Sequence, residues 1–245
     1  SELARTFNRM LDRLQEGFRQ EQRFVSDASH ELRTPLTVIL GYSDMLSRWG
    51  REDKNILDEG ITAIRSEAEN MQQLIEKLLF LARADQKRQA VNKEAVEFSE
   101  LLADTMEKMQ TVTTSHEVTL GRNDHAVVSA DPVLLRQLLR IFLENSVKYT
   151  PPGGHIHAYS ILSDDGKTIT VTLTDNGIGI APEHQARIFD RFYRVDSSRT
   201  KETGGSGLGL SIARWIAERH DIKIALRSAV DEGTTITLSI PTITE

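Results

Sequence analysis

Apolar residues recur at alternating intervals of four and three positions through the first third of the chain. One run comprises Phe7, Leu11, Leu14, Phe18, Val25, Ala28, Leu32 and Ile39, with Glu21 and Pro35 at its two remaining positions. The second run is uninterrupted and comprises Leu57, Ile61, Ile64, Ala68, Met71, Ile75, Leu78 and Ala82. This pattern predicts two long helices that pack along their length, as in a coiled coil or a four-helix bundle. Two helices cannot enclose such a seam from both sides, so we expect a dimer that completes four helices. An intramolecular hairpin capped by the rest of the chain is the alternative.

Two polar segments interrupt this pattern. Residues 48–53 break it between the two runs and are interpreted as a hairpin loop. Residues 85–89, with the sequence Asp-Gln-Lys-Arg-Gln, follow the second run and are interpreted as a linker. The chain is therefore expected to contain a helical hairpin and a second region that begins near residue 93.

The second region mixes helical and strand patterns. Asp131-Pro132 is a good pair for starting a helix, and the turn at residues 164–166 joins two alternating runs as in a β-hairpin. We expect helices over residues 98–110, 131–149 and 207–219, and strands over residues 155–162, 168–174, 222–228 and 234–240. Helices mixed with antiparallel strands predict an α+β fold in which this region forms an α/β sandwich.

Composition narrows the possible functions. The 245 residues are 39% hydrophobic and 27% charged, which is ordinary for a soluble globular protein. The net charge of −6 argues against nucleic-acid binding, which requires a basic face. The absence of cysteine excludes disulfides and cysteine-based zinc sites. No run approaches the roughly 18 apolar residues of a membrane span. A chain that starts without methionine, with a helical pattern already running at residue 3, suggests a piece of a longer protein.

A histidine lies inside the first predicted helix, in the octapeptide from Ser29 to Leu36. Relative to the apolar seam, His30 points outward, where another protein can reach it. Neutral imidazole is nucleophilic near pH 7, which suits a histidine to phosphoryl relay. A single exposed histidine is otherwise an ordinary surface residue. A zinc-protease motif would need a second histidine at position 34, where this chain has Thr34.

Three residues that follow His30 are relevant to its interpretation as a phosphoryl acceptor. Thr34 lies one helical turn further along the same face, so its hydroxyl can stand beside a group carried by His30. Glu31 is adjacent to His30 and can reach the imidazole only obliquely. Pro35 removes a backbone hydrogen bond and is expected to kink the helix.

Two glycine-rich segments of the second region can close on a ligand. The segment Asp175-Asn176-Gly177-Ile178-Gly179-Ile180 follows a predicted strand, where glycine amides can approach a ligand and the carboxylate can accept from an adenine amino group. Residues 204–210 open a predicted helix, and amides at a helix N-terminus are a natural phosphate site. Taken alone, the first segment is also compatible with an ordinary turn and the second with a flexible loop before a helix cap.

A third segment ends the helix predicted over residues 131–149. Asn145, Lys148 and Tyr149 are three and four residues apart and share one face. They offer an amide oxygen for Mg²⁺, a cation for phosphate and a ring for a base or ribose. An ordinary polar helix end is the alternative, and the order of all three segments favours the ligand site.

Together these segments resemble the dimerisation and catalytic core of bacterial sensor histidine kinases, over essentially the whole chain. The octapeptide around His30 is similar to their H-box. The other matches are Asn145 to Tyr149 with the N-box, Asp175 to Gly179 with the first glycine box, Phe189 to Arg194 with the F-box, and Gly205 to Leu210 with the second glycine box. Five motifs in this order are highly specific.

The resemblance implies a homodimeric four-helix bundle that carries His30, over residues 20–87. It implies an ATP-binding domain of the type shared with Hsp90 and gyrase, over residues 93–245. The implied activity is ATP-dependent autophosphorylation of His30, followed by phosphoryl transfer to an aspartate of a response-regulator receiver domain, together with phosphatase activity toward that partner. ATP and Mg²⁺ are the implied cofactors.

The resemblance also implies individual roles, carried over by position. His30 is the phosphoacceptor, Glu31 the base that orients and deprotonates it, and Thr34 the residue that positions water during dephosphorylation. Asp175 binds the adenine amino group and Asn145 holds Mg²⁺. The remaining implied nucleotide contacts are Lys148, Tyr149, Gly177, Gly179, Ile180, Arg194, Gly205, Gly207, Leu208 and Gly209. Residues 181–204 correspond to a mobile ATP lid.

One position departs from the family pattern. Many members carry a second asparagine one turn before Asn145, and here that position is Ile141. Magnesium is therefore expected to have fewer direct protein ligands and more water.

The start of the chain is similar to the tail of a HAMP signalling module, over residues 1–19. This weaker resemblance implies a transmembrane receptor upstream, with the present chain as its soluble cytoplasmic part at the inner or plasma membrane. The histidines other than His30 are interpreted as ordinary residues. His155 and His157 could share a strand face as metal ligands, but a solvated hairpin edge is the favoured interpretation.

Overall fold

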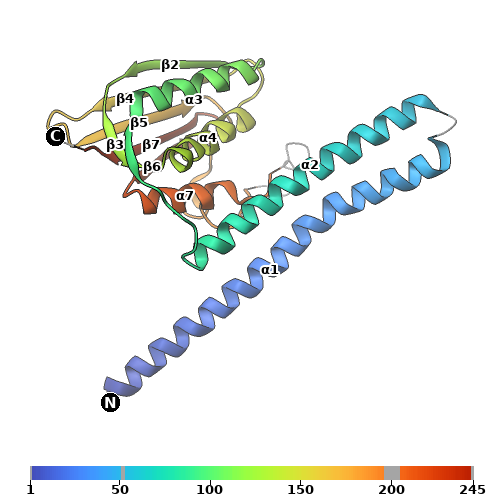
Figure 1. The fold of residues 1–245 in the computed structure, drawn as a ribbon, viewed down its shortest axis with the longest axis horizontal. Coiled ribbons are helices and arrows are strands. Elements are labelled where there is room, and N and C mark those ends of the chain that lie inside the picture. The colour runs from blue at the N-terminus through green and yellow to red at the C-terminus, as the bar shows by residue number, and fades with distance from the viewer. Residues whose placement is uncertain (1, 51–52, 196–204, 244–245) are drawn as a thin grey trace. The chain divides into compact units, whose positions relative to one another are not determined.

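The computed structural model describes residues 2–50, 53–195 and 205–243, and its ribbon is drawn in Figure 1. The chain divides into two compact units, Ser1–Phe80 and Leu81–Glu245. Residues 51–52 of the predicted hairpin loop and 196–204 of the predicted lid lie outside the described residues.

The first unit is a helical hairpin, as the apolar pattern predicted. Helix α1 spans Glu2–Trp49 and α2 spans Lys54–Asp85, of which residues 81–85 belong to the second unit. Where the helices meet, a Cβ added to Gly60 would lie only 2.7 Å from the Leu46 side chain, so glycine permits this close approach. Pro35 lies inside α1 without ending it. Figure 1 shows the two helices side by side.

Single-chain packing leaves the seam of α1 uncovered. None of the described residues of α1 is buried, and the side chains of Phe7, Leu14 and Phe18 are more than half exposed. A stripe of large apolar residues on one long helix is costly in water, at about 25 cal/mol per Å².

The second unit is a sheet covered by helices, which confirms the predicted α+β class. Its main sheet has the strand order β2-β4-β5-β7-β6, and β1 pairs with β3 in a separate two-stranded sheet. The strands are β1 (Glu94–Glu97), β2 (Glu117–Asn123), β3 (Val127–Ala130), β4 (His155–Leu162), β5 (Thr168–Asp175), β6 (Lys223–Ala229) and β7 (Gly233–Pro241). The helices are α3 (Phe98–Val112), α4 (Pro132–Tyr149), the short α5 (Pro182–Gln185) and α7 (Gly209–Arg219).

Helix α4 is the centre of this unit. Leu135, Leu138, Leu139 and Leu143 are fully buried on the face that it presents to the core. Figure 1 shows α4 between α3 and α7, all on one face of the sheet. The buried seam fixes the rotation of α4 and thereby the direction of the polar residues near its end.

Strands β1, β2 and β3 and helix α5 were not predicted from the sequence, and the strands are not all antiparallel as expected. Strand β2 pairs with β4 in parallel, with Val118 beside Ile156 and Leu120 beside Ala158. Only these two apolar positions alternate in β2 before Gly121 and Arg122 interrupt the pattern, so the strand signal is short. With β2 at the edge, His155 and His157 lie on an interior strand rather than on the hairpin edge expected for them.

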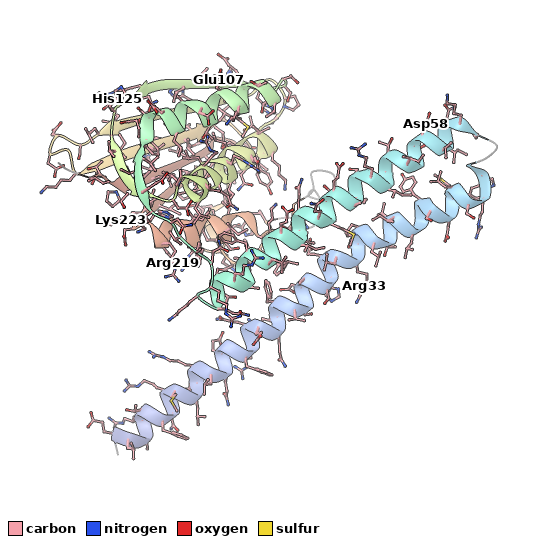
Figure 2. The ribbon with its side chains drawn as sticks, viewed as in Figure 1. Arg33, Asp58, Glu107, His125, Arg219 and Lys223 are labelled. Carbon is pink, nitrogen blue, oxygen red and sulfur yellow. The ribbon has the colours of Figure 1, made fainter. Side chains whose placement is uncertain are left out.

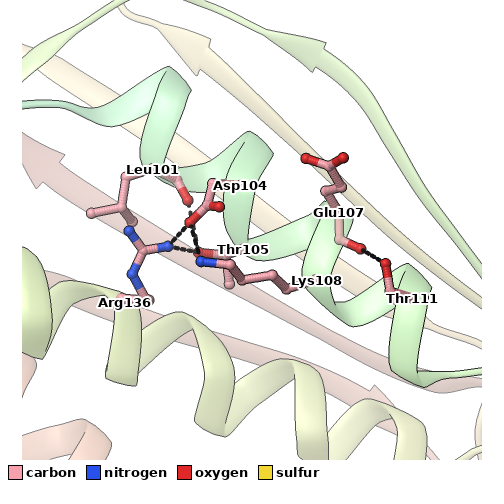
Figure 3. A network of polar contacts seen from close by, with 7 residues as sticks. All are labelled: Leu101, Asp104, Thr105, Glu107, Lys108, Thr111 and Arg136. Atoms are coloured by element: carbon pink, nitrogen blue, oxygen red, sulfur yellow. Dashed lines mark hydrogen bonds and ion pairs between the residues drawn. The ribbon is translucent and has the colours of Figure 1, made fainter.

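A polar network joins α3 to α4, as Figure 3 shows. The Asp104 carboxylate accepts a hydrogen bond from Lys108 Nζ at 3.0 Å and another from Arg136 of α4. The bond from Lys108 lowers the pKa of Asp104, with Arg136 acting in the same direction. Because the three side chains are all partly exposed to solvent, the network is expected to contribute little to the stability of the fold.

A network around the buried Asp131 ties the segment between α2 and β1 to α4 and α7. The Asp131 carboxylate accepts from two amides in the first turn of α4, at 3.0 and 3.2 Å, and from the Asn92 amide at 2.9 Å. The Asp131 amide donates to Nε2 of His220, which follows α7, at 3.0 Å. Nδ1 of His220 therefore carries the proton and donates to the Ile216 carbonyl at 2.8 Å. Burial lowers the pKa of His220, which favours this neutral form.

Candidate functional site

The predicted phosphoacceptor lies on the surface of α1. His30 and Thr34 are exposed and Glu31 is half-buried. The neighbouring hydroxyls are satisfied within the helix, since Ser29 donates to the Val25 carbonyl at 2.7 Å and Thr37 donates to the Arg33 carbonyl at 2.9 Å. The imidazole is thus presented to solvent on a continuous helix, as the sequence predicted. Figure 2 labels Arg33, which lies in the same segment of α1.

The end of α4 gathers the three polar residues of the predicted ligand site. Lys148 Nζ lies 4.9 Å from the centroid of the Tyr149 ring. Burial, and then the positive charge of Arg194, lower the pKa of Lys148. An anion at this position would offset both effects, because it favours the charged amine. The Asn145 side chain forms no hydrogen bond with the described residues, so its amide oxygen remains open to a ligand.

Asp175, at the end of β5, is held by hydrogen bonds from three elements. Its Oδ1 accepts from the Gly177 amide at 3.0 Å and from the Thr234 amide of β7 at 3.1 Å. Its Oδ2 accepts from the Ser146 hydroxyl of α4 at 2.8 Å. Ser146 therefore joins the predicted aspartate to the helix that carries Asn145. Asp175 is buried, with 8% of the residue exposed, so the direction of its carboxylate is set by these partners.

The glycines after Asp175 are required by close packing. A Cβ on Gly177 would lie 2.5 Å from the Tyr149 carbonyl oxygen and 2.9 Å from Thr150 Oγ1. A Cβ on Gly179 would overlap the Ala229 carbonyl oxygen, and its φ of +68° is itself unfavourable for other residues. The Ile180 amide donates to the Ser228 hydroxyl at 2.8 Å, so it holds the loop to β6.

Replacing Gly179 by alanine is expected to destabilise the protein more than replacing Gly166. Both have φ of +68°, but nothing lies within 4 Å of a Cβ on Gly166. Gly166→Ala should therefore lose only the cost of left-handed backbone, about 1–2 kcal/mol, while Gly179→Ala should lose about 1–3 kcal/mol more from overpacking. Urea unfolding of the two variants measures the difference. Equal losses would show that the approach to Ala229 does not matter.

The second glycine cluster leads into α7. Gly205 lies against Lys148 Nζ, and a Cβ on Gly207 would lie 2.7 Å from the backbone of Phe192. The Phe192 amide donates to the Gly207 carbonyl at 3.0 Å, and Phe192 itself has a φ of +60°. Leu208 is fully buried and anchors the cluster. Helix α7 begins at Gly209 without a side-chain cap, so its first amides can face a ligand.

Ile141 lies one turn before Asn145, at the position where this chain departs from the family pattern described above. A Cβ on Gly209 would lie 3.5 Å from Ile141 Cγ2, in ordinary contact. Ile141 thus contributes an apolar surface beside the start of α7 instead of a metal ligand.

The described residues contain no cluster of three or more His, Cys, Asp or Glu side chains that could hold a metal ion. A metal ion at this site would therefore rely on Asn145, the ligand's own oxygens and water, which is the donor set that Mg²⁺ accepts. The hydroxyls of Thr150 and Ser206 support ligand binding, because both are buried without a hydrogen-bond partner among the described residues.

The structure brings together most of the predicted site. Lys148 lies beside Arg194 and Gly205, and Asp175 is bonded to Ser146 and Gly177 within the same unit. The F-box residue Arg191 donates two hydrogen bonds to Asp85 at the end of α2, at 2.7 and 2.6 Å. His30 belongs to the other unit.

Sequence reasoning missed three residues that shape the site. Ser146 lies inside the segment that was singled out, but its role requires knowing that its hydroxyl faces β5. Thr234 and Thr150 carry no signal of their own, because a threonine in a strand or after a helix is common.

Comparisons with known proteins agree with this arrangement. Residues 20–87 match the family model described as the His Kinase A (phospho-acceptor) domain, and residues 130–244 match the histidine kinase-, DNA gyrase B- and HSP90-like ATPase. The chain is 38% identical over 237 residues to the sensor histidine kinase YkoH of Bacillus subtilis, covering 97% of this chain and 51% of that protein. The chain belongs to the sensor histidine kinases. It holds the phosphoacceptor and ATPase domains of a protein-histidine kinase.

Solved structures of other histidine kinases share the fold. The histidine kinase ThkA, in complex with response regulator protein TrrA, matches with a TM-score of 0.69 and 21% identity over 94% of this chain and 66% of that one. Full-length ShkA, in complex with AMPPNP, matches with a TM-score of 0.66 and 23% identity over 91% of this chain and 46% of that one. This histidine kinase chain spans about half the length of the curated relatives that it matches. Among its described helices, none combines the length and apolar character needed to cross a bilayer.

Proposed function

We propose that this chain is the autokinase core of a two-component receptor, which phosphorylates His30 with ATP and passes the group to a response regulator. The observation that carries the proposal is the hydrogen bond from Ser146 to Asp175. It fixes an acidic hydrogen-bond acceptor for the adenine base against α4, whose last turns carry Asn145 for Mg²⁺, Lys148 for phosphate and Tyr149 for the base or ribose. The ATPase family match supports nucleotide binding at this site.

The proposed reaction is a phosphoryl transfer. The adenine amino group donates to Asp175, and Lys148, Arg194 and the amides at Gly205 to Gly209 neutralise the phosphate charge. A ring nitrogen of His30 forms a bond to the γ-phosphorus as the bond to the bridging oxygen breaks, and ADP leaves with that electron pair. Glu31 orients the imidazole and accepts its proton. Asn145 would hold Mg²⁺, whose charge supports the same neutralisation.

The partners follow from the exposed surfaces of α1. The uncovered seam that includes Phe7, Leu14 and Phe18 supports a homodimer in which two hairpins form a four-helix bundle. The exposed His30 supports docking of a receiver domain, and the neighbour ThkA was solved with a response regulator.

We further propose the domain limits 1–19, 20–87 and 93–245 for a HAMP-derived helix, the dimerisation and phosphotransfer domain, and the ATP-binding domain. In this arrangement the chain is the cytoplasmic part of a membrane-anchored receptor.

The test of the proposed function is incubation with γ-³²P-ATP and Mg²⁺, followed by separate acid and alkali treatment. A phosphohistidine survives alkali and is lost in acid, so label with this stability is expected. ATP hydrolysis without any labelled protein would instead indicate an ATPase that drives conformational change.

Thr34→Ala is expected to lower phosphatase activity toward the phosphorylated partner by roughly tenfold or more, because a water molecule would lose its positioning hydroxyl. Labelling of His30 should persist. The matched control is Thr37→Ala, since Thr37 is another exposed threonine on α1 and its hydroxyl is bonded to the Arg33 carbonyl. Timed assays of both activities compare the variants, and equal loss of both in Thr34→Ala would refute a specific phosphatase role.

A further inference from the structure

A cavity of about 390 Å³ lies in the second unit, at the end of α7 that is remote from the glycine cluster. It is formed by alternate residues of the segment that joins α2 to β1 (the linker, here taken to residue 93) and by one face of α7, namely Lys87, Gln89, Val91, Lys93, Trp215 and Arg219. Trp215 and Arg219 follow Gly209 by six and ten residues, which corresponds to roughly 9 and 15 Å along the helix. None of the lining residues belongs to the ATP site.

The lining is strongly basic in a chain whose net charge is −6. Three of its six residues are cations. Lys93 faces Asp221 at 3.8 Å, but the Asp221 side chain is 82% exposed, so this pair is weak. Lys87 and Arg219 form no ion pair with the described residues. The cavity therefore concentrates positive charge and favours an anionic ligand.

Trp215 adds a planar surface to this charge. Its ring is half-buried, and the Arg219 guanidinium carbon lies 5.4 Å from the ring centroid. Figure 2 labels Arg219 at the end of α7. Val91 supplies an apolar contact and Gln89 an amide that can donate and accept. Cations beside an aromatic ring fit a molecule that has both a phosphate and a flat base.

The backbone at Lys87 has a conformation that is uncommon for a lysine. Lys87 has a φ of +56° in the turn that ends α2, where its amide donates to the Ala84 carbonyl at 3.1 Å. Glycine is the usual residue at such a left-handed position after a helix, because a side chain there carries a conformational cost. The lysine that occupies it is the residue whose side chain lines the cavity.

We propose that this cavity binds a small organic phosphate with a planar ring, of the size of a nucleoside monophosphate. Its volume lies within the range of about 300–1,000 Å³ for small-molecule sites. The phosphate lies among Lys87, Lys93 and Arg219, and the ring lies against Trp215. Because the lining comes from both the linker and α7, the ligand holds the linker to the ATP-binding domain. The proposal does not depend on ATP chemistry at the other site.

The test uses guanosine monophosphate as the probe, since its base carries an acceptor oxygen where adenine carries the amino group suited to Asp175. Trp49→Phe leaves Trp215 as the only tryptophan, because the chain has two. Titration should quench Trp215 fluorescence to saturation. Inorganic phosphate lacks the planar base, and guanosine lacks the phosphate. Each should therefore bind at least about tenfold more weakly than guanosine monophosphate.

Charge variants locate the binding site. Lys87→Gln and Arg219→Gln should each raise the dissociation constant of the probe by about tenfold, as expected for loss of one charged contact. Lys223→Gln is the matched control, because Lys223 is an exposed lysine near the same helix end that does not line the cavity. It should leave the constant unchanged.

Three results would overturn the proposal. These are no saturable quenching by guanosine monophosphate, equal affinity for inorganic phosphate, and an affinity that the Lys87 and Arg219 substitutions do not change. The substituted side chains are exposed, and thermal unfolding of each variant confirms that it remains folded.

Discussion

His30→Gln is expected to reduce alkali-stable labelling by γ-³²P-ATP at least about a hundredfold, to the background of the assay, because the nucleophile is removed. Glutamine approximates the length of histidine and preserves a polar, exposed position on α1. ATP binding should be unchanged, since His30 lies in the first unit and the proposed nucleotide-binding residues lie in the second. Labelling and calorimetric ATP binding, measured on the same preparation, separate the two effects.

The matched control for this substitution is His125→Gln. The His125 side chain is 86% exposed, like that of a generic surface histidine, and it precedes β3 in the second unit. This variant should be labelled like the unmodified protein. Persistent label in His30→Gln, or its loss in His125→Gln, would contradict the assignment of His30 as the acceptor.

Much of the fold is predictable because local sequence and packing agree. Helix α4 begins at Pro132 with Asp131 as its cap, and both features can be read from the dipeptide. The hairpin between β4 and β5 follows from alternating runs joined by Asp164-Asp165-Gly166. In these places a single short segment contains the information needed for its own structure.

The elements that were missed depend on distant partners. The parallel pairing of β2 with β4 requires a long connection, which short-range patterns do not specify. His220 was interpreted as ordinary, yet it accepts a hydrogen bond from Asp131, which is 89 positions away in sequence. That bond requires α4 and α7 to be packed first, so no pattern within the last helix reveals it.

The candidate site also contains residues that the sequence predicts and supporting residues that it does not. Asn145, Lys148 and Asp175 were predicted from residue type and spacing, because metal and phosphate chemistry restricts the choice of side chain. Their supports, Ser146 and Thr234, act through a hydroxyl and a backbone amide that many residues could offer. These supports become visible only when β5, β7 and α4 are assembled.

Asp175→Asn is expected to weaken ATP binding by about ten- to a hundredfold, which corresponds to the loss of about 1.5–3 kcal/mol for a hydrogen bond to a charged group. The two amides at Oδ1 and the hydroxyl at Oδ2 use three of the roughly four acceptor positions of the carboxylate. The remaining position can accept from the adenine amino group. In asparagine, the NH₂ group would take the place of Oδ2. It would then face the adenine amino group, and two hydrogen-bond donors cannot bond to each other.

The matched control is Asp165→Asn, which makes the same chemical change in the turn between β4 and β5. Asp165 also accepts from a hydroxyl, that of Ser163 at 2.7 Å, and from an amide two residues on, that of Lys167 at 3.1 Å. It lies outside the pocket, so calorimetry should detect unchanged ATP affinity. Asp165→Asn measures the effect of losing a turn aspartate alone. Any additional loss of ATP affinity in Asp175→Asn is then due to the loss of the hydrogen-bond acceptor for adenine.

Base selectivity distinguishes recognition from structural damage. A carboxylate favours adenine, which presents an amino donor, and disfavours guanine, which presents an acceptor oxygen at the same position. Asparagine offers a donor and should bind guanine relatively better, so the ratio of ATP to GTP affinity should fall in Asp175→Asn. A distorted pocket would weaken both nucleotides by the same factor and leave the ratio unchanged. That outcome would show that Asp175 shapes the loop through Gly177 and Thr234 without selecting the base.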